Sequence, residues 1–326
     1  MKFKVDKSTL WEKLQTVLGV VPQRTTFPIL TNVLLEAKKD HLKLAATDLD
    51  ISIVTGMPVE VTERGEITLP GRKLGEIVRE LPEVPISFSV ANSQATFKCD
   101  KGVFKLTGIE RGEYPELPEL DRGRSLSLDG ESLNRAVEKT SFAAASDEMR
   151  PALSGVLWQI RERDMRMVAT DGHRLALLKL INILDKPFSL EITVPPKALN
   201  QLGRLTGGKE SIEVRLEESK IGFYFNGNVI TARLVEGTFP DYEQVIPKDN
   251  DKVARLEREP FVSALRRVAV FSNPDTHLTK LSFDRDSLQL HTHTPEFGEA
   301  KEEVPCHYQG EKIEIGYNAG YLLDVL

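Results

Sequence analysis

The segment FPILTNVLLEAKKDHLKLAATDLDISIV, residues 27–54, returns in altered form as RPALSGVLWQIRERDMRMVATDGHRLALL, residues 150–178. The Thr-Asp pair at 47–48 matches the Thr-Asp pair at 170–171, which lies 123 residues later. Two similar segments at such a spacing indicate a structural unit that the chain uses more than once. The repeat, rather than a single large core, therefore decides the fold.

The repeat continues along the chain. Tyr-Pro at 114–115 matches Phe-Pro at 239–240 after 125 residues. A fainter third copy, HLTKLSFDRDSLQLHTHTPEFG at 277–298, places Leu-Ser-Phe 125 residues after the Val-Leu-Trp of the second copy. Three copies of about 120 residues suit three domains of ordinary size. We predict that the three domains occupy residues 1–122, 123–248 and 249–326.

Each copy shows the same order of elements. An amphipathic helix comes first, as in KSTLWEKLQTVLGVV at 7–21, where apolar residues recur at helical spacing. Strands with alternating apolar and polar residues follow, and a second helix begins near a proline, as at Pro70 and Pro196. Paired strands close the copy, and in the second copy they turn at Asn226-Gly227. This order predicts an α+β fold with mainly antiparallel sheets.

The pair Thr170-Asp171 has two interpretations. Asp171 close to His173 could form a general acid or base, because a carboxylate orients an imidazole, and the protein would then be a small-substrate hydrolase. Asp-Gly between two apolar stretches also predicts a tight hairpin turn with positive φ at both central residues. The first copy keeps Thr-Asp but continues as LDISI, so the shared pair belongs to the hairpin. No motif places a serine, a cysteine or a second carboxylate nearby, which favours the hairpin.

The composition is that of a globular protein, with 40% hydrophobic and 28% charged residues. Two cysteines, Cys99 and Cys306, argue against a disulfide scaffold and favour the cytoplasm. We expect neither a signal peptide nor a membrane span, since no apolar run approaches ~18 residues. No Gly-rich phosphate loop occurs, and His291 and His293 lack the spacing of a zinc motif. We therefore expect no cofactor and no metal.

The charges are distributed unevenly. The net charge of the whole chain is −6, but the predicted helical segments carry about +8 and the remainder about −14. Helices that turn an apolar face to a sheet and a basic face outward concentrate positive potential on one surface. Such a surface suits a polyanion such as nucleic acid. The segments counted are 7–24, 72–79, 130–146, 197–204 and 258–271.

Seven motifs follow one another along the whole chain: FPILTNVLL, TDLDI, LPGRKLGEIVRELP, VATDGHRLAL, TFPDYEQVIP, ALRRVAVFSN and YNAGYLLDVL. They resemble, in order, those of the bacterial DNA polymerase III beta subunit family, the sliding clamps. The resemblance implies three similar domains per chain and two chains closed head to tail into a ring, with helices lining a central pore and sheets outside.

The same resemblance implies a processivity factor and not an enzyme. Such a factor encircles duplex DNA without regard to sequence. It tethers DNA polymerase III alpha and other proteins that carry a clamp-binding motif. A clamp loader and the second chain of a homodimer complete the partners that the resemblance implies.

The resemblance also assigns residues to three surfaces. The DNA-binding surface is assigned to Arg24, Arg72, Lys73, Arg150 and Lys197. The partner-peptide pocket is assigned to Leu153, Thr170, Gly172, His173, Arg174, Leu175, Pro240 and Val245. The dimer interface is assigned to Lys101, Phe104, Lys105, Val270, Phe271, Glu299, Glu302 and Glu303. The two lysines have a second explanation, because lysines on an edge strand prevent unwanted pairing.

The third copy stops partway through the repeat. Matching Asn318 to Pro196 puts the end of a full third copy near residue ~369, roughly 43 residues after Leu326. The family's pocket is completed by a C-terminal strand. We therefore expect a third domain of low stability and weak ring closure. The alternative function is a clamp-like module that binds peptides without encircling DNA.

Overall fold

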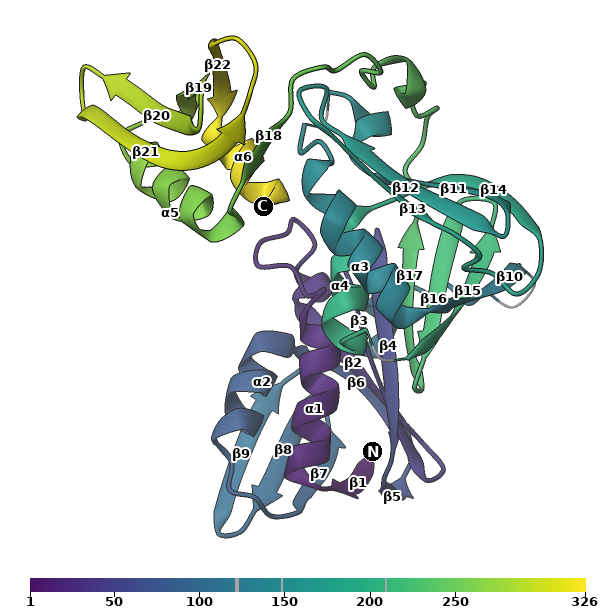
Figure 1. Cartoon of the computed structure of the whole chain (residues 1–326). Coiled ribbons are helices and arrows are strands. Elements are labelled where there is room, and N and C mark those ends of the chain that lie inside the picture. The colour runs from purple at the N-terminus through teal and green to yellow at the C-terminus, as the bar shows by residue number, and fades with distance from the viewer. Residues whose placement is uncertain (121–122, 148, 209) are drawn as a thin grey trace. The chain divides into compact units, whose positions relative to one another are not determined.

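The computed structural model describes every residue except 121–122, 148 and 209. The chain divides into two compact units, Met1–Phe239 and Pro240–Leu326 (Figure 1). The first unit contains the first two copies of the repeat, and the second unit contains the third copy.

Each copy has one helix early in its sequence and another later, as the repeat predicts. A short strand precedes the first helix in every copy, at Lys2–Val5, Arg124–Asp129 and Ala254–Leu256, so the prediction that a helix comes first is wrong. In the first helix, Leu10, Leu14 and Val17 are fully buried on one stripe, which gives the amphipathic pattern its physical basis. The first helices are α1 (Lys7–Leu18), α3 (Gly130–Thr140) and α5 (Arg258–Ala269). The second helices are α2 (Gly71–Glu80), α4 (Pro196–Thr206) and α6 (Ala319–Val325).

The strands form antiparallel sheets, so the predicted α+β class with antiparallel sheets is confirmed. One sheet of the first copy has the order β5 (Glu60–Glu63), β1 (Lys2–Val5), β7 (Ile86–Ala91), β8 (Gln94–Cys99) and β9 (Gly102–Thr107). One sheet of the second copy has the order β13 (Leu175–Leu180), β12 (Asp164–Thr170), β11 (Val156–Glu162) and β14 (Phe188–Val194).

A third sheet joins the first two copies. Strand β4 pairs with β17 through residues 51–54 and 229–232, so four strands of each copy form one continuous sheet. A single hydrophobic core runs through both copies, which explains why they form one unit. The order of this sheet is β10 (Arg124–Asp129), β15 (Ser211–Glu217), β16 (Lys220–Phe225), β17 (Asn228–Arg233), β4 (Ile51–Pro58), β3 (His41–Thr47), β2 (Asn32–Lys38) and β6 (Gly65–Pro70).

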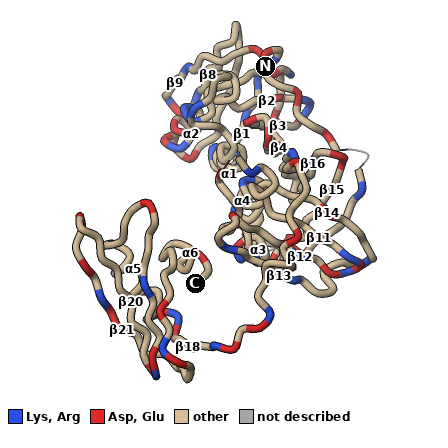
Figure 2. Tube along the Cα trace, turned by 90° about the horizontal axis from the view of Figure 1, so that it is seen from above, with Lys and Arg blue, Asp and Glu red and all other residues tan. Residues whose placement is uncertain are grey.

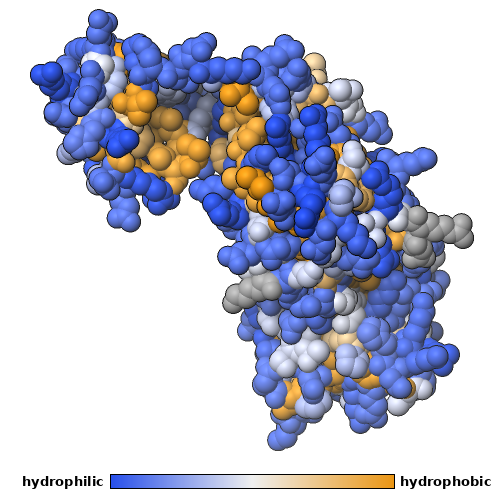
Figure 3. Space-filling model, turned by 45° about the vertical axis from the view of Figure 1, so that its right-hand side comes forward, coloured by the Kyte–Doolittle hydropathy of each residue, from blue (hydrophilic) through white to orange (hydrophobic). Residues whose placement is uncertain are grey.

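The second unit has its own sheet and core. Helix α5 packs Phe261, Leu265 and Val268 against the strands, and α6 adds Ala319. Hydrophobic side chains also reach the surface of this unit (Figure 3), including Val270, which is 75% exposed. The sheet order is β18 (Ala254–Leu256), β21 (Gly298–Tyr308), β20 (Ser287–Thr294), β19 (Leu278–Asp284) and β22 (Ile313–Asn318).

One turn and one helix cap show local side-chain and backbone effects. Asn226 and Gly227 form the predicted tight hairpin turn, with φ of +43° and +72°. Asn318 caps α6, because its side chain accepts hydrogen bonds from the backbone N–H groups of Gly320 and Tyr321. Among the described residues, no helix is both long and apolar enough to span a bilayer.

Candidate functional site

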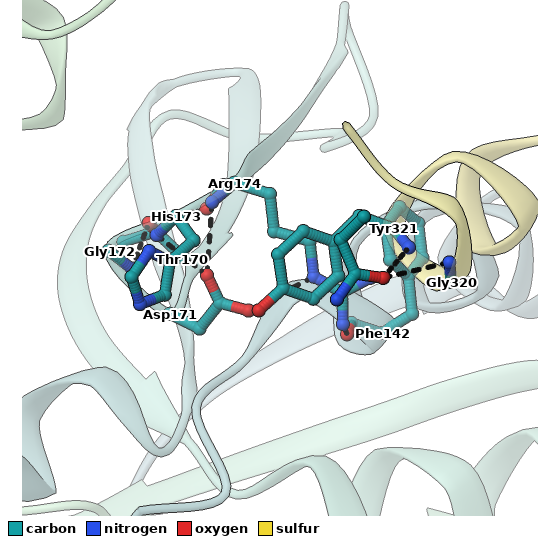
Figure 4. A network of polar contacts seen from close by, with 9 residues as sticks. Phe142, Thr170, Asp171, Gly172, His173, Arg174, Gly320 and Tyr321 are labelled. Atoms are coloured by element: carbon teal, nitrogen blue, oxygen red, sulfur yellow. Dashed lines mark hydrogen bonds and ion pairs between the residues drawn. The ribbon is translucent and has the colours of Figure 1, made fainter. Parts of the chain in front are cut away.

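The loop between β12 and β13 is held by the side chains of Thr170 and Asp171 (Figure 4). The Thr170 hydroxyl donates to the carbonyl of Arg174 at 2.6 Å and accepts from the N–H of Gly172 at 3.1 Å. One oxygen of Asp171 accepts from the N–H groups of His173 and Arg174, at 2.9 and 3.0 Å. Four local hydrogen bonds therefore fix the backbone that presents His173.

The first copy repeats all four bonds. Thr47 bonds the carbonyl of Ile51 and the N–H of Leu49, and Asp48 accepts from the N–H groups of Asp50 and Ile51. The third residue has positive φ in both loops, +84° at Leu49 and +88° at Gly172. The hydrogen bonds of the Thr-Asp pair thus stabilise the same loop in both copies.

The predicted form of this turn is wrong. Thr170 pairs with Leu175, so four residues separate the strands, and Gly172 has positive φ while Asp171 does not. A two-residue turn would have needed positive φ at both Asp171 and Gly172. The side-chain bonds of Thr170 and Asp171 stabilise the longer loop instead, as Asp and Thr commonly do in turns.

Arg174 connects this loop to the short helix Ser141–Ala143 that follows α3. Its guanidinium pairs with Asp171 at 3.1 Å, donates to the carbonyl of Phe142 at 2.7 Å and lies over the Phe142 ring at 5.4 Å (Figure 4). Burial alone would raise the pKa of Asp171, but the hydrogen bonds from His173 and Arg174 outweigh burial and lower it. A carboxylate held in this way is a poor general base at neutral pH, so Asp171 is a structural residue of the loop.

The residues assigned to the peptide pocket are divided between the two units, so each unit contains only part of the pocket. The residues at 170 and 172–175 share one loop, and Leu153 lies in the short helix Pro151–Leu153, whose last carbonyl accepts from the N–H of Ala145. Leu175 is partly exposed and His173 is exposed, so both are accessible to a ligand. Pro240 and Val245 belong to the second unit, where Val245 is 68% exposed.

Arg150 lies at the loop of residues 170–175, although the family resemblance assigned it to the DNA-binding surface. Its guanidinium is 2.7 Å from the position that a Cβ atom would take at Gly172. Arg150 also pairs with Asp147 at 3.8 Å. Glycine at 172 adopts the positive φ without strain and leaves room for Arg150, a contact that no motif predicted.

The other four cations assigned to DNA are exposed but differ in their partners. Arg24 and Arg72 have no ion-pair partner in the part of the chain that the structure describes. Lys73 pairs with Glu76 at 2.6 Å on the exposed face of α2. Lys197 pairs with Asp48, the acidic residue of the first-copy loop. Figure 2 shows lysines and arginines in blue along the chain, including some on the helices.

Sequence reasoning missed a cation that joins the first two copies. Arg204 on α4 donates to the carbonyls of Gln15 and Thr16 at 3.4 to 3.5 Å, near the C-terminal end of α1. Gln201 donates to the carbonyl of Gly19 at 3.1 Å. Burial lowers the pKa of Arg204. A basic side chain at the carbonyl end of a helix is stabilising, so Arg204 serves the contact between the copies.

Two open strand edges carry most of the residues assigned to a dimer interface, whereas Val270 and Phe271 directly follow helix α5. Strand β9 is outermost in its sheet and exposes Phe104 by 39%, beside the exposed lysines at 101 and 105. In the second unit, residues 298–305 of β21 pair with β20 on one side, while β18 covers only residues 306–308 on the other. Both edges can therefore accept a further strand.

The acidic residues on β21 already have partners within the chain. Arg267 forms a bidentate pair with Glu302, with both distances 2.6 Å. Glu299 contacts the ring of His291 at 2.7 Å, and Glu303 accepts from Ser287 at 2.8 Å. Any attraction of these glutamates to lysines across a dimer interface would compete with these bonds.

The described residues contain no group of three or more His, Cys, Asp or Glu side chains placed to hold a metal ion. Cys99 and Cys306 are both buried. Burial raises the pKa of both thiols, which disfavours the reactive thiolate.

Three repeats of two helices and antiparallel strands, with cationic helices and a structured exposed loop, define a clamp-type protein. Three models of one family match this chain: the N-terminal domain of the DNA polymerase III beta subunit at residues 1–118, the central domain at 127–241 and the C-terminal domain at 243–326. The chain belongs to the DNA polymerase III beta subunit family.

Relatives and solved structures agree with this membership. The beta sliding clamp of Pseudomonas putida is 35% identical, with all of this chain and 90% of the relative covered. The crystal structure of the DNA polymerase III subunit beta from Pseudomonas aeruginosa matches with a TM-score of 0.90 and 35% identity, covering 100% of this chain and 89% of that one. A sliding clamp from Bartonella birtlesii bound to griselimycin matches with a TM-score of 0.92 and 34% identity, with the same coverage.

Proposed function

We propose that this chain is a DNA polymerase processivity factor that encircles duplex DNA as a homodimeric ring and tethers its partners through the loop at residues 170–175. The observation that carries the proposal is the threefold repeat with basic helices in a chain of the beta subunit family. Contacts to phosphates rather than to base edges leave such a ring free to slide. DNA polymerase III alpha and a clamp loader are the proposed protein partners.

The hydrolase hypothesis has little support. Both carboxylate oxygens of Asp171 accept hydrogen bonds, from His173 and Arg174. The same loop occurs in the first copy, where Asp50 replaces His173. A loop needed in both copies for its backbone structure requires no catalytic explanation.

We expect Arg24→Ala with Arg72→Ala to weaken DNA retention equally on all sequences. Each lost phosphate contact should reduce the slope of log K against log salt by about one unit, so the slope should fall by about two. These two arginines are chosen because they have no ion-pair partner in the described structure, unlike Lys73 and Lys197. Salt titration of binding to duplexes of different sequence measures the effect.

The matched control is Arg64→Ala with Arg161→Ala, which removes the same charge from exposed positions on the strands and their turns. An equal fall in slope for the control, or losses that depend on DNA sequence, would contradict the phosphate contacts.

We expect His173→Ala with Leu175→Ala to weaken binding of a clamp-binding-motif peptide from the polymerase about 30-fold. The change removes an apolar wall and a polar rim, which corresponds to roughly 2 kcal/mol at an interface hot spot. Calorimetry with the full chain measures the affinity. The control, Leu49→Ala with Asp50→Ala, alters the matching loop of the first copy. Equal loss in both variants would place the pocket elsewhere.

A further inference from the structure

A groove runs along strand β14 of the second copy. Two hollows, of 340 and 660 Å³, share Ile192, Glu218, Ser219 and Leu234, so they adjoin. Strand β14 forms one side, and the turn between β15 and β16 forms the other. The groove shares no lining residue with the loop at 170–175. The volume of each hollow lies within the ~300 to 1,000 Å³ that is usual for ligand sites.

The side of the groove is an open sheet edge. Strand β14 is outermost in its sheet, and two of its carbonyls bond away from the sheet. The carbonyl of Ser189 accepts from Arg124 at 2.8 Å, and that of Thr193 accepts from the N–H of Val235 at 2.9 Å. In an antiparallel strand every second residue points its N–H and C=O the same way. Glu191, midway between them, therefore turns both backbone groups toward the groove.

The first copy closes the corresponding edge. There Thr68 of β6 and Ile109 exchange two backbone hydrogen bonds, each 3.0 Å long. Among the described residues of the second copy, the matching backbone contact is the single bond from Val235 to Thr193. The edge at Glu191 is therefore more open than the matching edge of the first copy.

The groove has an apolar floor and an acidic rim. Leu190, Ile192 and Leu234 line it as partly buried side chains. Exposed carboxylates surround them at positions 191, 217, 218 and 236. Of the two cations in the lining, Arg124 is held over the Phe188 ring at 4.3 Å and by Ser189, and Lys220 is partly buried. The rim therefore favours a cationic ligand.

We propose that this groove is a second docking site, which binds an extended basic peptide segment of a partner protein. The segment adds to the edge of β14 at Glu191 through backbone hydrogen bonds, as peptides do at exposed sheet edges. One of its apolar side chains packs on Leu190 and Ile192. The Lys or Arg side chains of the segment lie among the four glutamates. The apolar side chains on one face of the bound segment and the basic side chains on the other therefore determine which peptides bind.

The test uses the full 326-residue chain and a labelled octapeptide of alternating lysine and valine. We expect saturable binding that shifts the amide resonance of Glu191. Glu218→Lys with Glu236→Lys should weaken binding at least about tenfold, because two attractive charges become repulsive. The control Glu110→Lys with Glu113→Lys makes the same charge change at exposed positions of the first copy and should leave the affinity unchanged.

Two further probes separate edge pairing from general attraction. A peptide methylated at its backbone nitrogens keeps every charge but loses its donors, so it should bind at least about tenfold more weakly. The pocket variant His173→Ala with Leu175→Ala should bind the octapeptide normally. The proposal is overturned by no binding, by equal binding of a glutamate-valine peptide, by full affinity of the methylated peptide, or by loss in the pocket variant. This last result would leave the proposed function intact.

Discussion

Replacing Asp171 by alanine is expected to lower the free energy of unfolding by about 3 kcal/mol and to abolish measurable peptide binding. The change removes two hydrogen bonds to backbone N–H groups and the ion pair with Arg174, whose side chain is only 19% exposed. A hydrogen bond to a charged group contributes about 1.5 to 3 kcal/mol, and an ion left partly buried without its partner adds a cost. Thermal or urea unfolding followed by calorimetry with peptide measures both effects.

The pH dependence of this difference gives a sharper test. The pKa of Asp171 is lower in the folded chain than its ordinary value, so its contribution is present above the unfolded pKa of about 3.9. The difference between the native and Asp171→Ala chains should be constant near neutral pH. It should shrink as the pH falls through the folded pKa. A difference that grew on acidification would contradict the assignment.

Asp164→Ala is the matched control at the other end of β12. Asp164 also accepts a backbone hydrogen bond, from Asn182 at 3.0 Å, and pairs with Lys179 at 3.0 Å. Its side chain is 35% exposed and that of Lys179 is 44% exposed, so solvent weakens the pair. We expect less than about 1 kcal/mol of destabilisation and unchanged peptide affinity. Similar losses in both variants would show that the loop has no special role.

Periodic features of the sequence predicted most of the fold. The apolar stripe of α1 and the alternation in β20 are local patterns, and the repeat placed each of them in the same slot of every copy. The Thr-Asp loop was found for the same reason, because it recurs at 47–48 and 170–171. Its four-residue form was missed, since Asp-Gly in isolation favours a shorter turn and only the side-chain bonds decide between them.

Contacts between distant residues could not be predicted in this way. Lys197 and Asp48 are 149 residues apart, and their ion pair depends on the pairing of β4 with β17, which no pattern in the chain encodes. The placement of Arg150 beside Gly172 likewise depends on a contact between residues that are distant in the sequence. Candidate cations were therefore recognised by type and position, whereas the partners that hold some of them emerged only from the tertiary structure.

The last prediction concerns ring closure through the edge of β9. Phe104→Asp is expected to convert a dimer to monomers at low micromolar concentration, because it places a charge on the apolar centre of the proposed interface. Loss of such an anchor corresponds to about 100-fold weaker association, or roughly 3 kcal/mol, at one interface. A ring of two chains closed head to tail contains this interface twice. The losses combine, so the variant should lose nearly all of its dimer.

Sedimentation of the full chain, with retention on circular and linearised duplex DNA, measures the effect. A ring stays on circular DNA and leaves a linear end, whereas a module that only binds peptides makes no such distinction. Val84→Asp is the matched control, because Val84 is 38% exposed, close to the 39% of Phe104, and lies in a loop of the same copy. The control should remain dimeric and stay on circles. If Phe104→Asp also did so, β9 would not be the closing edge, and its lysines would serve only to prevent unwanted pairing.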